Sequence, residues 1–216
     1  MTLAIIPARG GSKGIQHKNL TVCARKPLLQ WTLDAVKDAS LVSEAVLSSD
    51  DQLILDLASN DPFGFRLDRR PSILAQDDTP TEDVIAHVLE TVSDASIVLL
   101  QPTSPIRTGA QIDEAIRLLQ STGADSVVSV VPTHELAWEQ GVWFAPLYTP
   151  TKRRRRQDMG QRYAENGSIY VFTLHSWEQN RCRIGAYTEP YIMDQASSIQ
   201  VDTLFDLWMA EQVLMR

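Results

Sequence analysis

Cysteine is scarce in this sequence, and its two cysteines, Cys23 and Cys182, lie far apart in the chain. They form no CxxC pair, which excludes a disulfide framework and a cysteine-rich metal site. The four histidines form no recognisable cluster either. This composition is typical of a reducing compartment, and we expect a cytoplasmic protein.

Long apolar runs are also missing. No stretch approaches the roughly 20 residues of a membrane-spanning helix, and the N-terminus leads directly into a predicted strand, so we expect neither a membrane protein nor a leader peptide. Positive charge is in deficit, because 20 Lys and Arg face 27 Asp and Glu, for a formal net charge of −7. This balance argues against nucleic acid as a partner and indicates that clusters of cations are local sites.

The chain does contain a regular alternation of short runs rich in Ile, Val and Leu with amphipathic segments. The runs predict buried strands at residues 3–7, 44–49, 95–100, 125–131 and 167–172. The amphipathic segments predict helices that include residues 28–36 and 203–216. The alternation predicts an α/β fold with a Rossmann-like, doubly wound, mostly parallel sheet, whose ligands bind beyond the carboxyl ends of the strands.

Two further helix N-termini are marked by capping-box patterns. Thr79 and Glu82 form the first, with Pro80 at the first helical position. Thr108 and Gln111 form the second. Both lie between predicted strands, as the alternation requires.

The alternation breaks between residues 132 and 165. This segment carries several prolines, two tryptophans and the basic run KRRRRQD, a composition that favours an inserted arm over another strand and helix unit. We therefore expect one domain over residues 1–216, with residues 132–165 as an inserted arm.

A glycine-rich, cationic loop follows the first predicted strand, in the stretch IIPARGGSKGIQHKN. Three glycines, Gly10, Gly11 and Gly14, let backbone amides approach an anion closely. Three cations, Arg9, Lys13 and Lys18, offset its charge. The loop fits neither the P-loop pattern nor GxGxxG. It indicates a polyphosphate site, with a glycine-rich surface turn as the alternative, and its position after a strand favours the site.

This loop resembles the signature of the acylneuraminate cytidylyltransferases, which make CMP-activated sialic acids and related nonulosonic acids. The resemblance continues in order through VLSSDD, RRPSILAQDDTPT, LLQPTSPIRT, RRQD, YAENGSIY and SIQVDTLFDL. It is weaker toward the ketodeoxyoctonate cytidylyltransferases, whose first loop differs. It implies a single nucleotidyltransferase domain that transfers CMP from CTP to the anomeric hydroxyl of a nonulosonic acid and releases pyrophosphate.

The resemblance implies a nucleotide site of seven residues. Loop residues hold the triphosphate and two others recognise cytosine, in all Arg9, Ser12, Lys13, Lys18, Asn19, Arg70 and Thr81. Thr81 has an alternative role in a helix N-terminus. The implied catalytic groups are Arg9, Lys18 and Asp202, which act through charge and position, since no side chain identifies itself as a general base.

The resemblance also implies a site for the acid. Its members are Gln101, Thr103, Ser104, Arg156, Asn166 and Tyr170. The first three follow a predicted strand in a loop that two prolines constrain, which suits a rigid set of hydrogen-bonding groups. Asn166 and Tyr170 have alternative roles as a turn residue and a strand aromatic.

Four consecutive arginines, residues 153–156, lie in the predicted arm. Such a run is ordinarily a solvated charge cluster. In the family the arm exchanges between two subunits, and an arginine at the position of Arg156 reaches the substrate carboxylate of the neighbouring site. A guanidinium suits that role because it can grip a carboxylate with two hydrogen bonds. The resemblance thus implies a homodimer with residues 132–165 as the dimerisation arm.

The match weakens before the last predicted helix, where the family has an Asp-x-Asp pair and this chain has Gln200 and Asp202. The implied cofactor is Mg²⁺, or Mn²⁺, held by Asp202 and a neutral oxygen of Gln200. Asp202 has an alternative role as the helix N-cap, and Asp50 is either structural or close to the metal. The amide at position 200 predicts weaker metal binding, a single-metal site or a reduced turnover.

Three functions are therefore compared below. The first is an active nonulosonate cytidylyltransferase, the second a nucleotide-binding homologue with weakened catalysis, and the third a nucleotidyltransferase for another nucleotide or sugar acid. The sequence does not choose among sialic, legionaminic, pseudaminic and related acids, because their differences are peripheral and a few pocket contacts decide between them.

Overall fold

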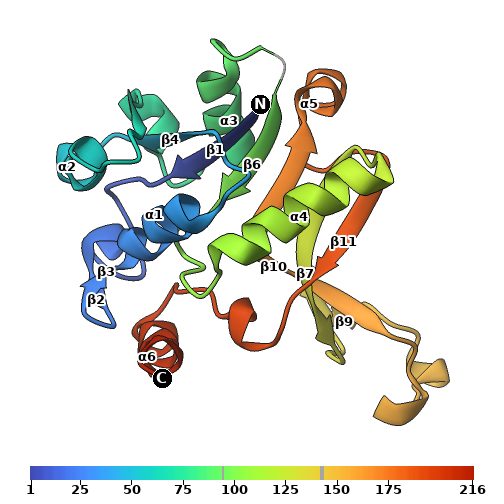
Figure 1. The fold of residues 1–216 in the computed structure, drawn as a ribbon. Coiled ribbons are helices and arrows are strands. Elements are labelled where there is room, and N and C mark those ends of the chain that lie inside the picture. The colour runs from blue at the N-terminus through green and yellow to red at the C-terminus, as the bar shows by residue number, and fades with distance from the viewer. Residues whose placement is uncertain (94, 142–143) are drawn as a thin grey trace.

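A seven-stranded sheet runs through the computed structural model, which describes residues 1–93, 95–141 and 144–216 (Figure 1). The strands lie in the order β11-β7-β10-β6-β1-β4-β5. Their bounds are β1 Thr2–Pro7, β4 Glu44–Ser49, β5 Arg66–Arg69, β6 Ser96–Leu100, β7 Ser126–Thr133, β10 Arg162–Thr173 and β11 Thr188–Ile192. Only β10 is antiparallel to its neighbours among these strands. The predicted mostly parallel α/β sheet is confirmed.

Helices cover both faces of this sheet. They are α1 Leu28–Asp38, α2 Gln52–Ser59, α3 Thr81–Leu89, α4 Gly109–Thr122, α5 Leu174–Asn180 and α6 Leu204–Leu214. In β1, Ala4 and Ile6 pack in a cluster with α1, α2 and α4, whereas Leu3 and Ile5 pack in a second cluster with α3 and α5. Alternating side chains thus point to opposite faces, and burial on both faces explains the continuous apolar runs.

Of the two predicted capping boxes, the first is wrong and the second is confirmed. The Thr79 hydroxyl accepts from Gln76 N and donates to the Ile73 carbonyl, so it bonds the preceding loop and does not cap α3. The N-cap of α3 is Pro80, without a side-chain bond. The box of Thr108 and Gln111 is confirmed, with bonds of 3.3 and 2.9 Å in the two directions.

The last helix, α6, begins with a capping box that the sequence analysis did not identify. Thr203 is the N-cap and its partner is Asp206. The alternative role of Asp202 as the N-cap is therefore wrong, because the following threonine takes that place. Leu204, Phe205 and Trp208 on α6 are exposed. No helix in the part of the chain that the structure describes is both long and apolar enough to cross a membrane.

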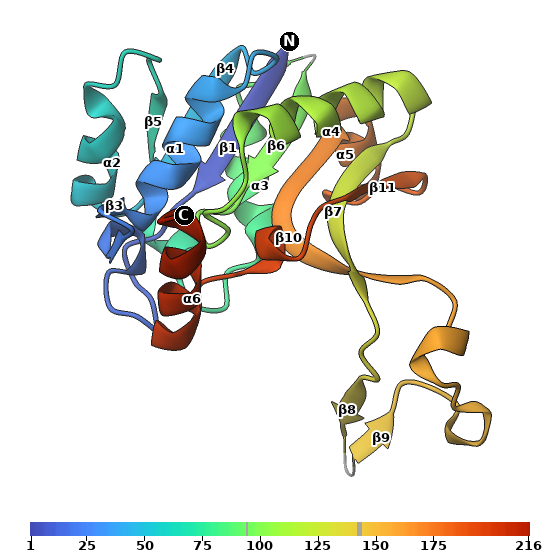
Figure 2. The same cartoon turned by 60° about the horizontal axis from the view of Figure 1, so that its bottom comes forward.

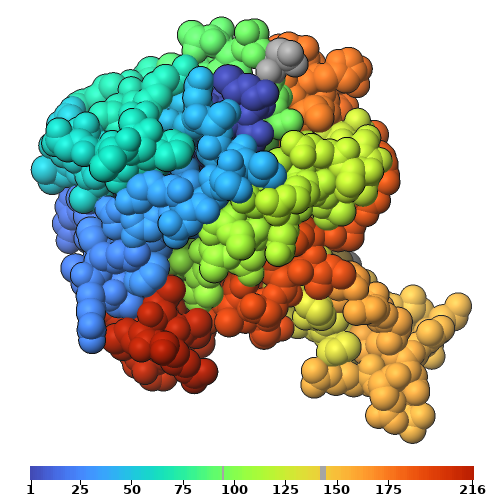
Figure 3. Space-filling model, viewed as in Figure 1, coloured from blue at the N-terminus to red at the C-terminus, as the bar shows by residue number. Residues whose placement is uncertain are grey.

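Between β7 and β10 the chain leaves the body as a projecting arm (Figure 2). The arm contains the strands β8 Trp138–Gln140 and β9 Phe144–Pro146 and two short 3-10 helices, Pro150–Lys152 and Arg156–Asp158. In the space-filling view it stands apart from the body on the face shown (Figure 3). One of the two arm tryptophans, Trp143, lies outside the described residues. A small hairpin of β2 Val22–Cys23 and β3 Lys26–Pro27 follows the first loop.

Candidate active site

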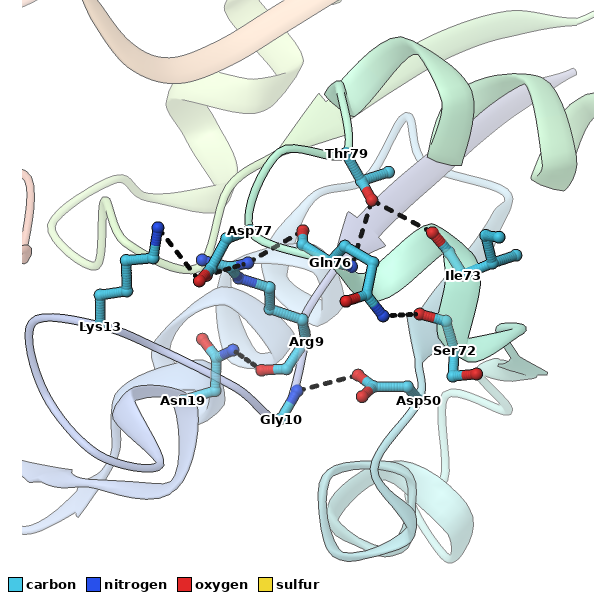
Figure 4. Close-up of polar contacts among 10 residues, drawn as sticks. All are labelled: Arg9, Gly10, Lys13, Asn19, Asp50, Ser72, Ile73, Gln76, Asp77 and Thr79. Atoms are coloured by element: carbon cyan, nitrogen blue, oxygen red, sulfur yellow. Dashed lines mark hydrogen bonds and ion pairs between the residues drawn. The ribbon is translucent and has the colours of Figure 1, made fainter.

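The glycine-rich loop leaves the carboxyl end of β1 and is held in place by two hydrogen bonds. Gly10 N donates to Asp50 Oδ1 at 2.9 Å, and Asn19 Nδ2 donates to the Arg9 carbonyl at 2.9 Å (Figure 4). A Cβ at Gly10 would lie 2.8 Å from that of Asp51, so this close approach requires glycine. Asp50, at the end of β4, therefore has a structural role in shaping the loop.

A cavity of about 260 Å³ opens beside this loop at the carboxyl ends of β1 and β6. Eight of the residues predicted for ligand binding line it, namely Arg9, Ser12, Lys18, Asn19, Arg70, Thr81, Gln101 and Thr103. We call it the first cavity. The structure thus brings together segments from three distant parts of the sequence, at the sheet edge where ligands bind in such folds.

Asp77 forms ion pairs with two cations of the glycine-rich loop in this structure. Its carboxylate lies 2.8 Å from Arg9 Nη1 and 3.1 Å from Lys13 Nζ (Figure 4). The hydrogen bond from Lys13, assisted by Arg9, lowers the pKa of Asp77 below its ordinary value. Sequence analysis missed this residue, although it lies in the acidic pair that follows RRPSILAQ. The carboxylate thus offsets part of the positive charge of the loop.

Arg70 presents hydrogen-bond donors without acceptors. Its side chain lines the first cavity and the residue is only 5% exposed. Among the described residues, Nε and Nη2 of this guanidinium have no hydrogen-bond partner. Burial lowers its pKa, an effect that the charges of Asp50 and Asp68 partly offset. Unsatisfied buried donors are costly, so this arginine is suited to a ligand that supplies acceptors.

A second cavity, of about 560 Å³, lies on the other side of the Lys18–Asp202 ion pair. Its lining includes Asn166, Gln200 and Asp202. Lys18 Nζ lies 2.8 Å from Asp202 Oδ1, although the two residues are 184 positions apart. Because Lys18 lines the first cavity and Asp202 the second, the pair marks where the two cavities approach each other.

Three residues predicted for the acid are buried. The Asn166 amide accepts from Ser129 Oγ at 2.5 Å and donates to the Ser197 carbonyl at 3.4 Å. Burial, assisted by the charge of Glu165, raises the pKa of Tyr170 to about 12, and its hydroxyl donates to that glutamate. Tyr170 lines neither cavity, and Ser104 is buried beneath the first. Contact of these side chains with an acid stays a prediction.

Arg156 lies in the arm, away from both cavities of its own chain. Its side chain is exposed and lines two shallow hollows of the arm together with His134 and Met159. Arg156 lines neither of the two cavities described above, and its contact with the substrate of a neighbouring chain stays a prediction.

Arg107 is a residue that the sequence analysis missed. Its buried guanidinium donates to the Ser168 and Gln101 carbonyls, each at 2.8 Å, and to the Thr32 hydroxyl at 2.6 Å. Burial lowers the pKa of Arg107 to about 9, which leaves it charged at neutral pH. It stands in the quoted stretch LLQPTSPIRT, but nothing in that sequence indicates its burial. Arg107 fixes the loop that carries Gln101.

The residues present fit a metal held largely by a substrate. No group of three or more His, Cys, Asp or Glu that could hold a metal occurs among the residues described. Asp202 offers one carboxylate near the triphosphate loop, and Gln200 uses its Nε2 to donate to the Asn166 carbonyl. Mg²⁺ commonly binds through one or two carboxylates, several waters and substrate phosphates, and one carboxylate beside a phosphate site meets that requirement.

Comparison with known proteins agrees with this geometry. Residues 3–179 match the family model described as Cytidylyltransferase. A CMP-N,N'-diacetyllegionaminic acid synthase of Legionella pneumophila is 33% identical over 98% of this chain and 95% of its own length. The N-acylneuraminate cytidylyltransferase A of Danio rerio is 31% identical over 99% of this chain but only 50% of its own length. The chain thus spans about half the length of several curated relatives that it matches.

Solved structures share the fold. A CMP:2-keto-3-deoxy-manno-octonic acid synthetase, solved in complex with CTP, superposes with a TM-score of 0.73 over 99% of this chain and 98% of its own, at 16% identity. A 4-diphosphocytidyl-2C-methyl-D-erythritol synthase from Anaerococcus prevotii gives 0.71 at 15% identity, over 100% of this chain and 96% of its own. The resemblance in the motifs is confirmed by the sequence relatives, and the protein belongs to the cytidylyltransferase family.

Proposed function

We propose that the protein transfers CMP from CTP to the anomeric hydroxyl of a nonulosonic acid and releases pyrophosphate. The observation that carries this proposal is the pair of cavities that approach each other at Lys18 and Asp202. One is lined by loop cations and an unsatisfied arginine, and the other by amide and carboxylate groups. The names of the relatives support the same chemistry, since they describe synthesis of CMP-diacetyllegionaminic acid and cytidylyl transfer to acylneuraminate.

In this proposal the first cavity holds the nucleotide. Arg9 and Lys18 offset the triphosphate charge, and the loop amides shaped by Gly10 approach its oxygens. The free donors of Arg70 and the hydroxyl of Thr81 at the start of α3 take the cytosine. Each of these groups lines the first cavity or belongs to the glycine-rich loop beside it.

The chemical step is a displacement at phosphorus. The anomeric oxygen of the acid forms a bond to the α-phosphorus, the bond from that phosphorus to the oxygen that bridges it to the β-phosphorus breaks, and the hydroxyl releases its proton to solvent water. Pyrophosphate carries away the negative charge, so catalysis depends on position and on charge stabilisation by Arg9 and Lys18. A divalent ion on Asp202, Mg²⁺ or Mn²⁺, would supply charge neutralisation at the phosphate oxygens.

The test is pyrophosphate release with CTP, Mg²⁺ and a panel of nonulosonic acids that begins with N,N'-diacetyllegionaminic and N-acetylneuraminic acids. Release that needs a metal, and that stops with chelator, is the expected result. CTP binding without release for any acid would favour a homologue with weakened catalysis. Preference for another nucleoside triphosphate would favour a different nucleotidyltransferase.

Replacing Asp77 by Asn is expected to lower the dissociation constant of CTP by roughly two- to tenfold, because exposed ion pairs are individually weak and the substitution removes two of them. The substitution releases Arg9 and Lys13 from the carboxylate they now contact. Calorimetric titration measures the change. Asp78→Asn is the control, since it removes the same charge one residue further on, at an exposed side chain. Weaker binding by the Asp77 variant would contradict this role.

We also propose that the protein is a cytoplasmic homodimer in which Arg156 completes the partner's site. The exposed basic arm and the uncovered Leu204, Phe205 and Trp208 support a second copy as the partner. The free cysteines, Cys23 and Cys182, are consistent with a reducing compartment.

Mixing two inactive variants tests the dimer. Equal amounts of Arg156→Ala and Lys18→Met subunits, after exchange, are expected to recover about a quarter of the parent activity, since half of the dimers contain one intact composite site. Enzyme assays and native mass spectrometry of the mixture provide the measurement. Mixed dimers without recovered activity would show that Arg156 does not act across the interface.

A further inference from the structure

Gln200 makes a contact that an aspartate at its position could not make. Its Nε2 donates a hydrogen bond of 2.7 Å to the carbonyl oxygen of Asn166, which lies 34 residues earlier. An ionised carboxylate has no proton to donate. The amide at position 200 therefore supplies an interaction of its own, beyond the loss of a carboxylate.

The Asn166 carbonyl is available because the sheet is irregular there. The register of β10 against β7 shifts between Glu165 and Tyr170. The next residue, Gly167, has a φ of +65°, and a Cβ on it would lie 1.9 Å from Gln200 Nε2 and 3.1 Å from Gln101 Oε1. Two amide side chains therefore lie against this irregular point within strand β10, which we call the Asn166–Gly167 turn.

The turn lies between the two cavities. Gln101 lines the first cavity, whereas Asn166 and Gln200 line the second. On its buried side the turn is fixed by Arg107, which donates to the Ser168 carbonyl at 2.8 Å. On the side of the second cavity, the bond from Gln200 holds it.

We propose that Gln200 is a positioning residue, which fixes the Asn166–Gly167 turn as the wall between the two cavities and so sets where the acid lies relative to the α-phosphate. This inference rests on the proposed function. It differs from the metal role predicted from the sequence, because the interacting atom is the amide nitrogen and its partner is protein backbone.

The Gln200→Met variant removes the donor at similar side-chain length and without added charge. The expected result is a KM for the acid raised roughly five- to tenfold, the loss of one hydrogen bond, with an unchanged dissociation constant for CTP. Amide hydrogen exchange of Ser168 and Ile169 is expected to accelerate, because the Ser168 N–H donates to Asn166 Oδ1 and the Ile169 N–H donates to Ser129 Oγ, which itself bonds the Asn166 side chain.

The Gln200→Glu variant separates positioning from metal binding, since it adds a carboxylate and removes the same donor. Positioning predicts a KM for the acid at least as high as that of Gln200→Met, with no fall in the Mg²⁺ concentration for half-maximal rate. If position 200 is instead a lost metal ligand, the Mg²⁺ concentration for half-maximal rate should fall and the KM for the acid should stay at the parental value. Gln195→Glu places the same charge on the wall of the second cavity and measures the effect of charge alone.

Parental KM values and exchange rates in Gln200→Met would overturn the proposal, as would tighter Mg²⁺ dependence with an unchanged KM in Gln200→Glu. Failure of the parent protein with every acid would instead reject the proposed function. The exchange rates of Ser168 and Ile169 would still decide whether Gln200 holds the turn.

Discussion

The Lys18→Met variant is expected to lose roughly 10²- to 10³-fold in kcat/KM, the usual cost of removing one group that stabilises developing charge. The Lys18 side chain is only 13% exposed and lies 2.8 Å from Asp202, between the two cavities. Without it, the Asp202 carboxylate faces the triphosphate uncompensated. Initial rates of pyrophosphate release, with CTP and acid varied in turn, measure the loss.

Lys13→Met provides the matched comparison, because it makes the same change on the same loop. The Lys13 side chain is 78% exposed and pairs with Asp77. Its replacement is expected to cost less than about tenfold, as for an exposed ion pair. Equal losses in the two variants would show that the net charge of the loop matters and the location of Lys18 does not.

The Gly167→Ala variant is expected to lower the free energy of unfolding by about 2–3 kcal/mol. A non-glycine residue in the left-handed region costs about 1–2 kcal/mol, and the new methyl must displace Gln200 Nε2, which breaks its bond to Asn166 at a cost of about 1 kcal/mol. For a chain of this size the unfolding temperature should fall by roughly 5–10 °C. Thermal and denaturant unfolding measure both quantities.

Gly123→Ala isolates the backbone part of this cost. Gly123 caps α4 at a φ of +67°, and a Cβ there would meet nothing within 4 Å. Its replacement should cost about 1 kcal/mol. If both alanine variants lost the same stability, the close approach of Gln200 to Gly167 would be refuted.

The central strands were predictable because they are buried on both faces and read as continuous apolar runs, as Leu3 to Ile6 do. The edge strands β5 and β11 were not predicted. Each pairs with a single neighbour. The sequence RLDR is largely exposed and TEPYI is partly exposed, and neither carries an apolar run. An edge strand forms because the neighbouring strand presents backbone N–H and C=O groups for hydrogen bonding. The sequence of the edge strand itself does not show that such a neighbour is present.

The loop cations were predictable from local chemistry, whereas the groups that hold the site were not. Arg107 and Gln200 donate to backbone carbonyls, and any residue has a carbonyl, so no sequence pattern identifies the partner. The predicted capping box at Thr79 was wrong for the same reason, because the Thr79 hydroxyl bonds backbone groups of the preceding loop. Such contacts follow from the tertiary fold alone.

The pairing of Lys18 with Asp202 also has a consequence for synthesis on the ribosome. The glycine-rich loop emerges 184 residues before the carboxylate that completes its surroundings. Its strand, β1, must likewise wait for β4 and β6 before it is paired on both sides. Contacts between distant parts of a chain form late in folding, so a nascent chain that does not yet include Asp202 would carry the loop without its site.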